Sequence, residues 1–366
     1  MITIKTKLFE ILKDLYYKFV QYWYLLPNKK KKRKCENEII NIPRVSKEIK
    51  AFVTPVYLNK KAILTIISDD GFYYTGKILK KYTEQFNIPI TVAGSVRLIH
   101  RHRKFWKSVV KEHEFECVSH SYNHIRMEEG TAISKDYKKL YHEIVHSCKY
   151  FKRLFGKEQI AFVCPENQMC SLGYEVLKSN NIYAVARGNR GLNGLSPDYG
   201  NEPGQWLYLK RCGIKDHTNK DIRVVRNNLV DTAIQEGAWL IEMWHDVDKN
   251  EKLRFQTITP EAAEEHLSYV SGRKDKIWTA LFTDAIKYIY EREHAIVKAA
   301  ICDNYLFVYV NLESLPMDIF DHELTVKVNC SSNLFDNYKL DYQFDDEMRF
   351  ILVNVFPGKL MRIPLK

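Results

Sequence analysis

Short apolar segments alternate with helix-like segments along the middle of the chain. The apolar segments predict strands at residues 62–68, 88–94, 115–119, 160–163, 182–186, 206–210, 238–244 and 277–282. Helical periodicity is clearest at 136–155 and 260–272, and a last helix is predicted at 283–293. Short apolar strands that alternate with helices are typical of parallel sheets, so the pattern predicts an α/β fold with a distorted (β/α)7–8 barrel.

The pattern changes after about residue 294. Segments such as YLFVYVNL at 305–312 and MRFILVNV at 348–355 alternate apolar and polar residues. This alternation predicts antiparallel strands that bury one face, arranged as a small C-terminal β domain packed as a sandwich. The predicted organisation is an amphipathic helix with a polybasic linker at 1–50, the barrel at 51–293 and an accessory β domain at 294–366.

The positive charge is concentrated near the N-terminus. The formal net charge is +11, and residues 1–34 hold ten Lys and Arg, including KKKKRK at 29–34, against Glu10 and Asp14. The rest of the chain is close to neutral and has no nucleic-acid-binding motif, so no nucleic-acid partner is expected. An amphipathic helix followed by a basic run either contacts an anionic membrane surface or packs on the protein itself.

The eight cysteines are scattered and form no CxxC pair, which is typical of reduced thiols in a protein core. Charged residues interrupt every apolar run near the N-terminus, so neither a signal peptide nor a membrane-spanning segment is expected. The sequence therefore favours a cytoplasmic protein, with residues 1–34 as a candidate peripheral contact to the inner membrane.

Polar clusters follow four of the predicted strands. They are Asp69 and Asp70, His120 and His124, Pro165, and His245. Because the carboxyl ends of barrel strands line one face, we expect these side chains to lie close together. One carboxylate and two imidazoles form a common open site for a divalent metal, Zn²⁺ first among them.

Five segments together resemble the NodB-homology polysaccharide deacetylases, carbohydrate esterase family 4. They are TIISDDGF, HSYNH, FVCPEN, WLIEMWHDVD and IWTALFTDAIKYIYERE, and the resemblance covers about residues 55–293. It implies metal-dependent hydrolysis of N-acetyl groups, with O-acetyl groups as the second choice, on a glycan or glycan precursor of the cell envelope. It also implies that Asp70, His120 and His124 bind the metal, that Asp69 is the catalytic base and that His245 is the general acid.

The third motif of the family is altered in this chain. The resemblance implies that a backbone N–H after Pro165 helps to hold the oxyanion, with Pro165, Glu166 and Arg187 as oxyanion or substrate candidates. Val163 and Asn167 stand where the family has an arginine, which steadies the base, and a glycine. Arg187 is the candidate for the missing charge, and the Asp-rich fourth motif is not evident.

Two rival functions remain open from the sequence. HEIVH at 142–146 matches the zinc-peptidase pattern, in which His142 and His146 would bind the metal and Glu143 would act as the base. A helix on the outside of the barrel explains the same segment. The second rival is a non-catalytic barrel that binds a glycan without hydrolysing it, which the altered third motif favours.

Deletion of residues 1–34 tests the membrane contact. If the amphipathic helix and basic run bind anionic lipid, the full chain will co-sediment with anionic vesicles and the shortened chain will remain in the supernatant. Neutral vesicles are the control, because basic residues are attracted to anionic headgroups. Unchanged sedimentation after the deletion would remove the membrane contact.

Overall fold

A computed structural model describes most of the chain beyond the N-terminal segment. The described residues are 47–111, 114–188, 190–196, 208–214, 222–250, 253–302, 305–329, 344–345 and 348–364. All described residues belong to one compact unit, Ile42–Lys366. The predicted N-terminal helix and the KKKKRK run lie outside the described residues.

Eight parallel strands form the central sheet. Its order is β7-β6-β5-β4-β3-β9-β8, and β10 pairs with the first half of β3. The strands are β3 (Ala62–Asp70), β4 (Ile90–Gly94), β5 (Phe115–Ser119), β6 (Ala161–Val163), β7 (Ala184–Ala186), β8 (Cys212–Gly213), β9 (Trp239–Trp244) and β10 (Ile277–Thr279). The prediction of a parallel α/β sheet is confirmed, and only the predicted strand at 206–210 differs in kind.

The segment at 208–213 closes the sheet into a distorted barrel. Leu209 bridges to Ala186 of β7, and the next residues form β8, which pairs with β9. Between them, the Asn193 side chain binds both the backbone N–H and the backbone C=O of Lys210, at 2.8 and 2.9 Å. Because the Asn193 side chain binds the backbone groups of Lys210, these groups cannot pair with a neighbouring strand. The described part of the predicted strand at 206–210 therefore forms only the bridge at Leu209, and Trp206 and Leu207 are not among the described residues.

Both faces of the parallel strands are buried. Along β3, Leu64 and Ile66 belong to one apolar cluster, and Ile63 and Ile67 belong to another. Successive side chains of a strand point to opposite faces, so a strand buried on both sides must be apolar throughout. This requirement explains why β3 is apolar up to Ile67 except at Thr65, whose buried hydroxyl accepts the Trp239 indole N–H at 3.0 Å.

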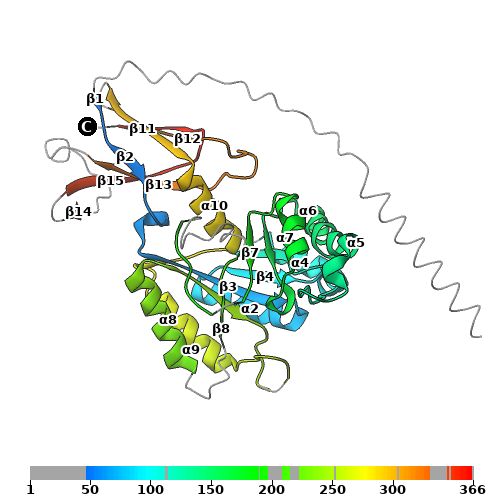
Figure 1. The fold of residues 1–366 in the computed structure, drawn as a ribbon. Coiled ribbons are helices and arrows are strands. Elements are labelled where there is room, and N and C mark those ends of the chain that lie inside the picture. The colour runs from blue at the N-terminus through cyan, green and yellow to red at the C-terminus, as the bar shows by residue number, and fades with distance from the viewer. Residues whose placement is uncertain are drawn as a thin grey trace, which may run out of the picture. The chain divides into compact units, whose positions relative to one another are not determined.

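Helices connect the strands and cover the sheet. They are α2 (Tyr73–Phe86), α3 (Val96–Arg101), α4 (Arg103–Val109), α5 (Tyr137–Tyr141), α6 (Ser147–Phe155), α7 (Ser171–Lys178), α8 (Ile222–Glu236), α9 (Pro260–Ser271) and α10 (Phe282–Glu293). Figure 1 shows α8 and α9 side by side, after β8 and β9 in the chain. None of the helices described here is long and apolar enough to cross a membrane.

The predicted helix at 136–155 is interrupted by one wider turn. It consists of α5, a π-helical turn at His142–His146 and α6. The Asp136 side chain caps its start by accepting the Lys139 N–H at 3.1 Å, and Gly156, with φ +76°, ends it. The wider turn is formed by the HEIVH segment.

Among the described residues, two antiparallel sheets are formed by strands that follow the barrel in the chain, together with the short strands at 47–48 and 51–53 that precede it. Their orders are β1-β11-β12-β16 and β14-β15-β13-β2. The strands are β1 (Lys47–Glu48), β2 (Ala51–Val53), β11 (Ala295–Cys302), β12 (Tyr305–Leu312), β13 (Leu324–Asn329), β14 (Phe344–Asp345), β15 (Met348–Val355) and β16 (Leu360–Pro364). The predicted antiparallel strands near the C-terminus are confirmed where they are described. β11, which is rich in alanine, was not predicted.

Helix α10 contacts both the barrel and the antiparallel sheets (Figure 1). Its Tyr288 hydroxyl donates to the carbonyl of Thr54 at 2.9 Å, just beyond β2. Its Glu291 accepts the backbone N–H of His322 at 2.9 Å, and the second carboxyl oxygen of Glu291 is buried without a partner among the described residues. A carboxyl group in this position is costly to ionise.

Glu291 should make stability fall as the pH rises from its ordinary pKa of 4.5 to about 8. Burial raises the pKa of Glu291 to about 8, although the His322 N–H and the Lys287 charge oppose this shift. The folded protein therefore keeps a proton that the unfolded chain releases above its ordinary pKa of 4.5, so stability decreases as the pH rises toward 8. Between pH 6.5 and 8, the free energy of unfolding should fall by about 2 kcal/mol more in the unmodified protein than in Glu291→Gln.

Urea denaturation at several pH values measures this difference. Burial lowers the pKa of His322 to about 4. His322 therefore changes the free energy of unfolding mainly between pH 4 and its ordinary pKa of 6.5, below the pH range in which Glu291 is tested. Glu293→Gln, at a partly exposed position of the same helix, is the matched control and should keep the original slope. Equal slopes for the unmodified protein and Glu291→Gln would contradict the prediction.

Candidate metal centre

Asp69 and Asp70 are the last two residues of β3, where the backbone turns sharply. Asp70 has φ +73° and the following Gly71 has φ +81°. A Cβ atom at Gly71 would lie 2.8 Å from Cδ1 of Ile99, and this φ is unfavourable for residues with a side chain, so the position requires glycine. The turn lets the two neighbouring carboxylates reach different partners.

Asp70, His120 and His124 form a cluster of three metal-binding groups. Each offers one ligand atom, and these atoms lie within 4.8 Å of one another. His124 Nε2 is 3.0 Å from Asp70 Oδ1, and His120 Nε2 is 3.9 Å from the same oxygen. Within the described part of the chain, no other group of three such side chains is this close. The juxtaposition expected from the strand ends is therefore present.

His120 is oriented by the neighbouring strand. Its side chain is 1% exposed, and its Nδ1 lies 2.9 Å from the carbonyl oxygen of Val163 at the end of β6. A carbonyl oxygen only accepts, so Nδ1 carries the proton and the lone pair of Nε2 faces Asp70. Burial lowers the pKa of His120, more than Asp69 and Asp70 raise it. A neutral imidazole in this tautomer suits a metal ligand.

His124 is held against Asp70 by the loop after β5. Its backbone N–H donates to the Ser121 hydroxyl oxygen at 2.9 Å. The hydrogen bond to Asp70 raises the pKa of His124. Burial acts to raise the pKa of Asp70, but the hydrogen bond from His124 and the charges of His120, His124 and His245 outweigh it and lower this pKa to about 2.

Asp69 is paired with an arginine that the sequence analysis missed. Arg211 Nη1 lies 2.8 Å from Asp69 Oδ1 and 3.0 Å from Oδ2, and both residues are buried. Arg211 directly precedes β8, in the segment that closes the barrel. One signal in the sequence could have identified Arg211 as a site residue. It directly follows the predicted strand at 206–210, just as the other polar clusters follow their predicted strands.

The altered third motif contributes to this arginine contact. After β6, Pro165–Asn167 form a short 3₁₀ turn, in which Asn167 has φ +57°. Asn tolerates this left-handed conformation better than most residues, which explains how it can stand where the family has glycine. Its side-chain oxygen accepts a hydrogen bond from Nη2 of Arg211. Val163, in place of the family's arginine, is fully buried.

The two remaining substrate candidates have other partners. Arg187 donates to the Tyr174 hydroxyl at 2.9 Å, and its guanidinium lies 4.7 Å from the centre of the Tyr208 ring. The guanidinium that contacts Asp69 is therefore that of Arg211. Glu166 has a half-exposed side chain, with Oε2 3.7 Å from Nε of Arg126. Pro165 is buried at the start of the turn.

His245 follows β9 at the same edge of the sheet. Its backbone carbonyl accepts the hydroxyl of Ser68, the residue before Asp69, at 3.3 Å, which places it near the metal cluster. Its ring lies edge-on to Phe255, with the centroids 5.2 Å apart. Its buried Nδ1 has no hydrogen-bond partner among the described residues. The carboxylate of the next residue, Asp246, binds Thr75 and Arg254 instead.

The HEIVH segment has a geometry that does not favour a peptidase site. Both carboxyl oxygens of Glu143 accept N–H groups, from the backbone of Tyr122 and Asn123 and from the Asn123 side chain. His142 and His146 turn their Nδ1 atoms toward each other at 3.1 Å. Among the described residues, the one group of three metal-binding side chains is Asp70, His120 and His124. His142 and His146 therefore have no third ligand beside them in this part of the chain, and the peptidase alternative is not favoured.

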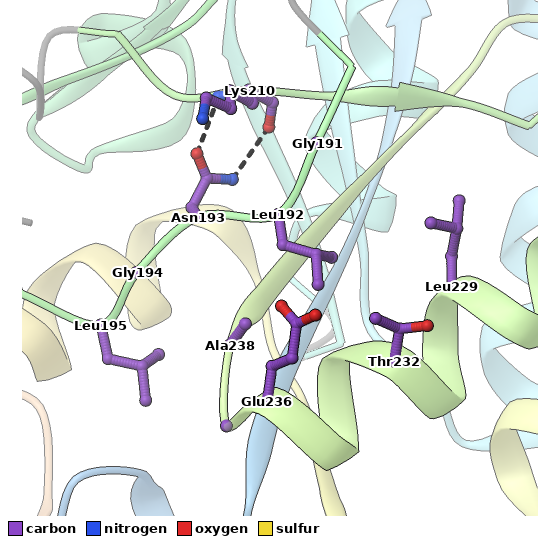
Figure 2. A pocket seen from close by; sticks show the side chains of 11 residues that line it. Gly191, Leu192, Asn193, Gly194, Leu195, Lys210, Leu229, Thr232, Glu236 and Ala238 are labelled. Atoms are coloured by element: carbon purple, nitrogen blue, oxygen red, sulfur yellow. Dashed lines mark hydrogen bonds between the residues drawn. The ribbon is translucent and has the colours of Figure 1, made fainter. Parts of the chain in front are cut away.

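A separate cavity of about 440 Å³ lies near the other end of β9. It is lined by residues 191–195 and 236–238, together with Lys210, Leu229 and Thr232. Figure 2 shows Asn193 bound to Lys210 at its edge, with Leu229, Thr232 and Glu236 carried by α8. Ala238 precedes β9, whereas His245 follows it, so this cavity and the metal cluster lie near opposite ends of the strand.

No protein-family model matches the chain, and no curated protein matches it by sequence. Solved structures do match, 52 chains in all. A family 4 carbohydrate esterase from Streptomyces lividans, solved with acetate, is 12% identical with a TM-score of 0.40, covering 61% of this chain and 93% of that one.

Two further matches differ in what they do. A carbohydrate esterase family 4 pseudoenzyme from Bacillus anthracis is 12% identical, with a TM-score of 0.42, and the match covers 62% of this chain and 66% of that one. An allantoinase is 12% identical, with a TM-score of 0.49, over 66% of this chain and 94% of that one. The family that the sequence motifs resemble is thus represented among similar structures, and we argue the roles of these residues from their own geometry.

Proposed function

We propose that this protein is a divalent-metal-dependent deacetylase that hydrolyses N-acetyl groups on a polysaccharide or oligosaccharide. O-acetyl groups are the second choice of bond. The observation that carries the proposal is the cluster of Asp70, His120 and His124, whose ligand atoms lie within 4.8 Å of one another beside the buried Asp69. The substrate class, an acetylated glycan, is inferred from the motifs that resemble the polysaccharide deacetylases. The candidate substrate is a precursor of a cell-envelope glycan made in the cytoplasm.

The donor set fits Zn²⁺. Two imidazoles and one carboxylate are common zinc ligands and leave positions open for water and substrate. The carbonyl of Val163 fixes His120 in the tautomer that a ligand needs. When bound by Asp70, His120 and His124, the cation supplies Lewis acidity to the acetyl carbonyl and to the attacking water.

The other polar groups then take complementary roles. Asp69, fixed by Arg211, accepts a proton from the attacking water as a general base. The backbone N–H after Pro165 is the donor for the developing oxyanion. His245 donates a proton to the departing sugar amine as a general acid. The edge-on contact with Phe255 holds the His245 ring, since its Nδ1 has no hydrogen-bond partner among the described residues.

Replacement of His124 tests the metal site against the peptidase alternative. His124→Ala should lose bound metal and reduce acetate release from an N-acetylated oligosaccharide by more than about 100-fold, because loss of a ligand exceeds the 10–100-fold effect of losing a supporting group. His142→Ala, at the matched position of the HEIVH segment, should keep both. Metal content by atomic emission and acetate by enzymatic assay measure the two effects.

The opposite pattern, with loss only in His142→Ala, would replace the deacetylase by the peptidase. An unmodified protein that binds the oligosaccharide but releases no acetate would instead be the glycan-binding barrel.

Arg211→Met should destabilise the protein by about 3–5 kcal/mol, because it leaves the buried carboxylate of Asp69 without its partner. Adding Asp69→Asn should recover most of this loss, while acetate release stays abolished because the base is absent. Urea denaturation gives the free energies of unfolding. Arg187→Met is the matched control and should show no such recovery, since Arg187 binds Tyr174. Strictly additive losses for Asp69 and Arg211 would contradict the pairing.

A further inference from the structure

The loop that carries His124 has an unfavourable backbone. Ser121 has φ +64° and His124 has φ +61°, and neither is glycine. Residues with a side chain in this region cost on the order of 1–3 kcal/mol each and persist where the surroundings hold them. The loop therefore needs fixed contacts to keep His124 facing Asp70.

Glu143 supplies three of these contacts from the π-helical turn. Its carboxylate is 2% exposed and accepts the backbone N–H of Tyr122 at 3.1 Å and that of Asn123 at 2.8 Å. The Asn123 side-chain amide donates to its other oxygen at 2.8 Å. Tyr122 and Asn123 lie between the two residues with positive φ. Hydrogen bonds to a buried carboxylate are short and about twice as strong as neutral ones.

The same turn is also tied to the strand before the loop. The Ser147 hydroxyl oxygen lies 2.6 Å from that of Ser119, the last residue of β5. It is also 2.7 Å from the carbonyl oxygens of Glu143 and Ile144, so it fixes the turn to the strand end. The π-helical turn thus contacts the chain on both sides of His120. Single π-turns inside helices are often found at functional sites.

We propose that Glu143 is a positioning residue that holds the loop between His120 and His124 in its metal-binding conformation. This inference rests on the proposed metal site. It gives the HEIVH segment a role in the deacetylase site: Glu143 acts through Tyr122 and Asn123, which lie between the two imidazoles in the chain, and touches neither metal nor substrate. Loss of its charge should weaken metal binding, as loss of supporting hydrogen bonds does at other metal sites.

Metal affinity of Glu143→Gln tests the proposal. The amide keeps the size of the side chain but presents an NH₂ group to N–H donors, so at least one contact to the loop is lost. The dissociation constant for Zn²⁺, measured by competition with a chromophoric chelator, should rise about 10–100-fold. The visible spectrum of the Co²⁺-substituted protein should change as well, which a loss of stability alone would not cause. Glu175→Gln, on the exposed side of α7, is the matched control and should change neither.

A folded Glu143→Gln variant with the original Zn²⁺ dissociation constant and Co²⁺ spectrum would overturn the proposal. If Glu143→Gln does not fold, Asn123→Ala decides, because it removes one of the three donors and leaves the carboxylate paired with the backbone. It should weaken Zn²⁺ binding to a smaller extent, and an unchanged constant would again overturn the proposal.

These outcomes are distinct from failure of the proposed function. An unmodified protein that binds Zn²⁺ through His124 but releases no acetate would reject the deacetylase and leave the role of Glu143 intact. Unchanged Zn²⁺ binding in Glu143→Gln, together with lost binding in His124→Ala, would reject the role of Glu143 alone.

Discussion

The site depends on two adjacent carboxylates that cannot share one counter-charge. Neighbouring negative charges at the end of a buried strand repel each other, and each needs a positive partner or a proton. The left-handed turn at Asp70 and Gly71 separates them. Asp69 reaches the guanidinium of Arg211, while Asp70 reaches the two imidazoles. The segment before β8 and the loop after β5 supply these partners, and the turn after β6 holds Arg211.

Much of this arrangement could be predicted from the sequence because parallel strands end at a common edge. Once the apolar runs were assigned to strands, the polar residues directly after them had to gather there, as Asp70, His120 and His124 do. Strand pattern also predicted the barrel and the antiparallel strands. The closing strand at 206–210 was overestimated, since apolar periodicity does not reveal that the side chain of Asn193 replaces a strand partner at Lys210.

Partners from distant parts of the chain were beyond prediction. The family's arginine is missing at position 163, and the sequence offered Arg187 as the substitute, whereas the barrel closure brings Arg211 to Asp69. Glu143 was noticed as part of HEIVH, yet its contacts with Tyr122 and Asn123 depend on a π-helical turn, which no residue pattern indicates. In both cases the sequence shows the residue type but does not show which partner its side chain reaches. The orientation of a side chain is set by how helices and strands pack against one another.

The pairing of β2 with β13 has a consequence for how the protein is made. Val53 is paired with Val326, so the second antiparallel sheet joins an early segment of the chain to a late one. During translation β2 leaves the ribosome long before its partner exists, and its open edge must wait while the barrel strands emerge. Pairing between segments so far apart is slow to form. Cells that make this protein therefore face a period in which nascent chains expose an unpaired strand to one another.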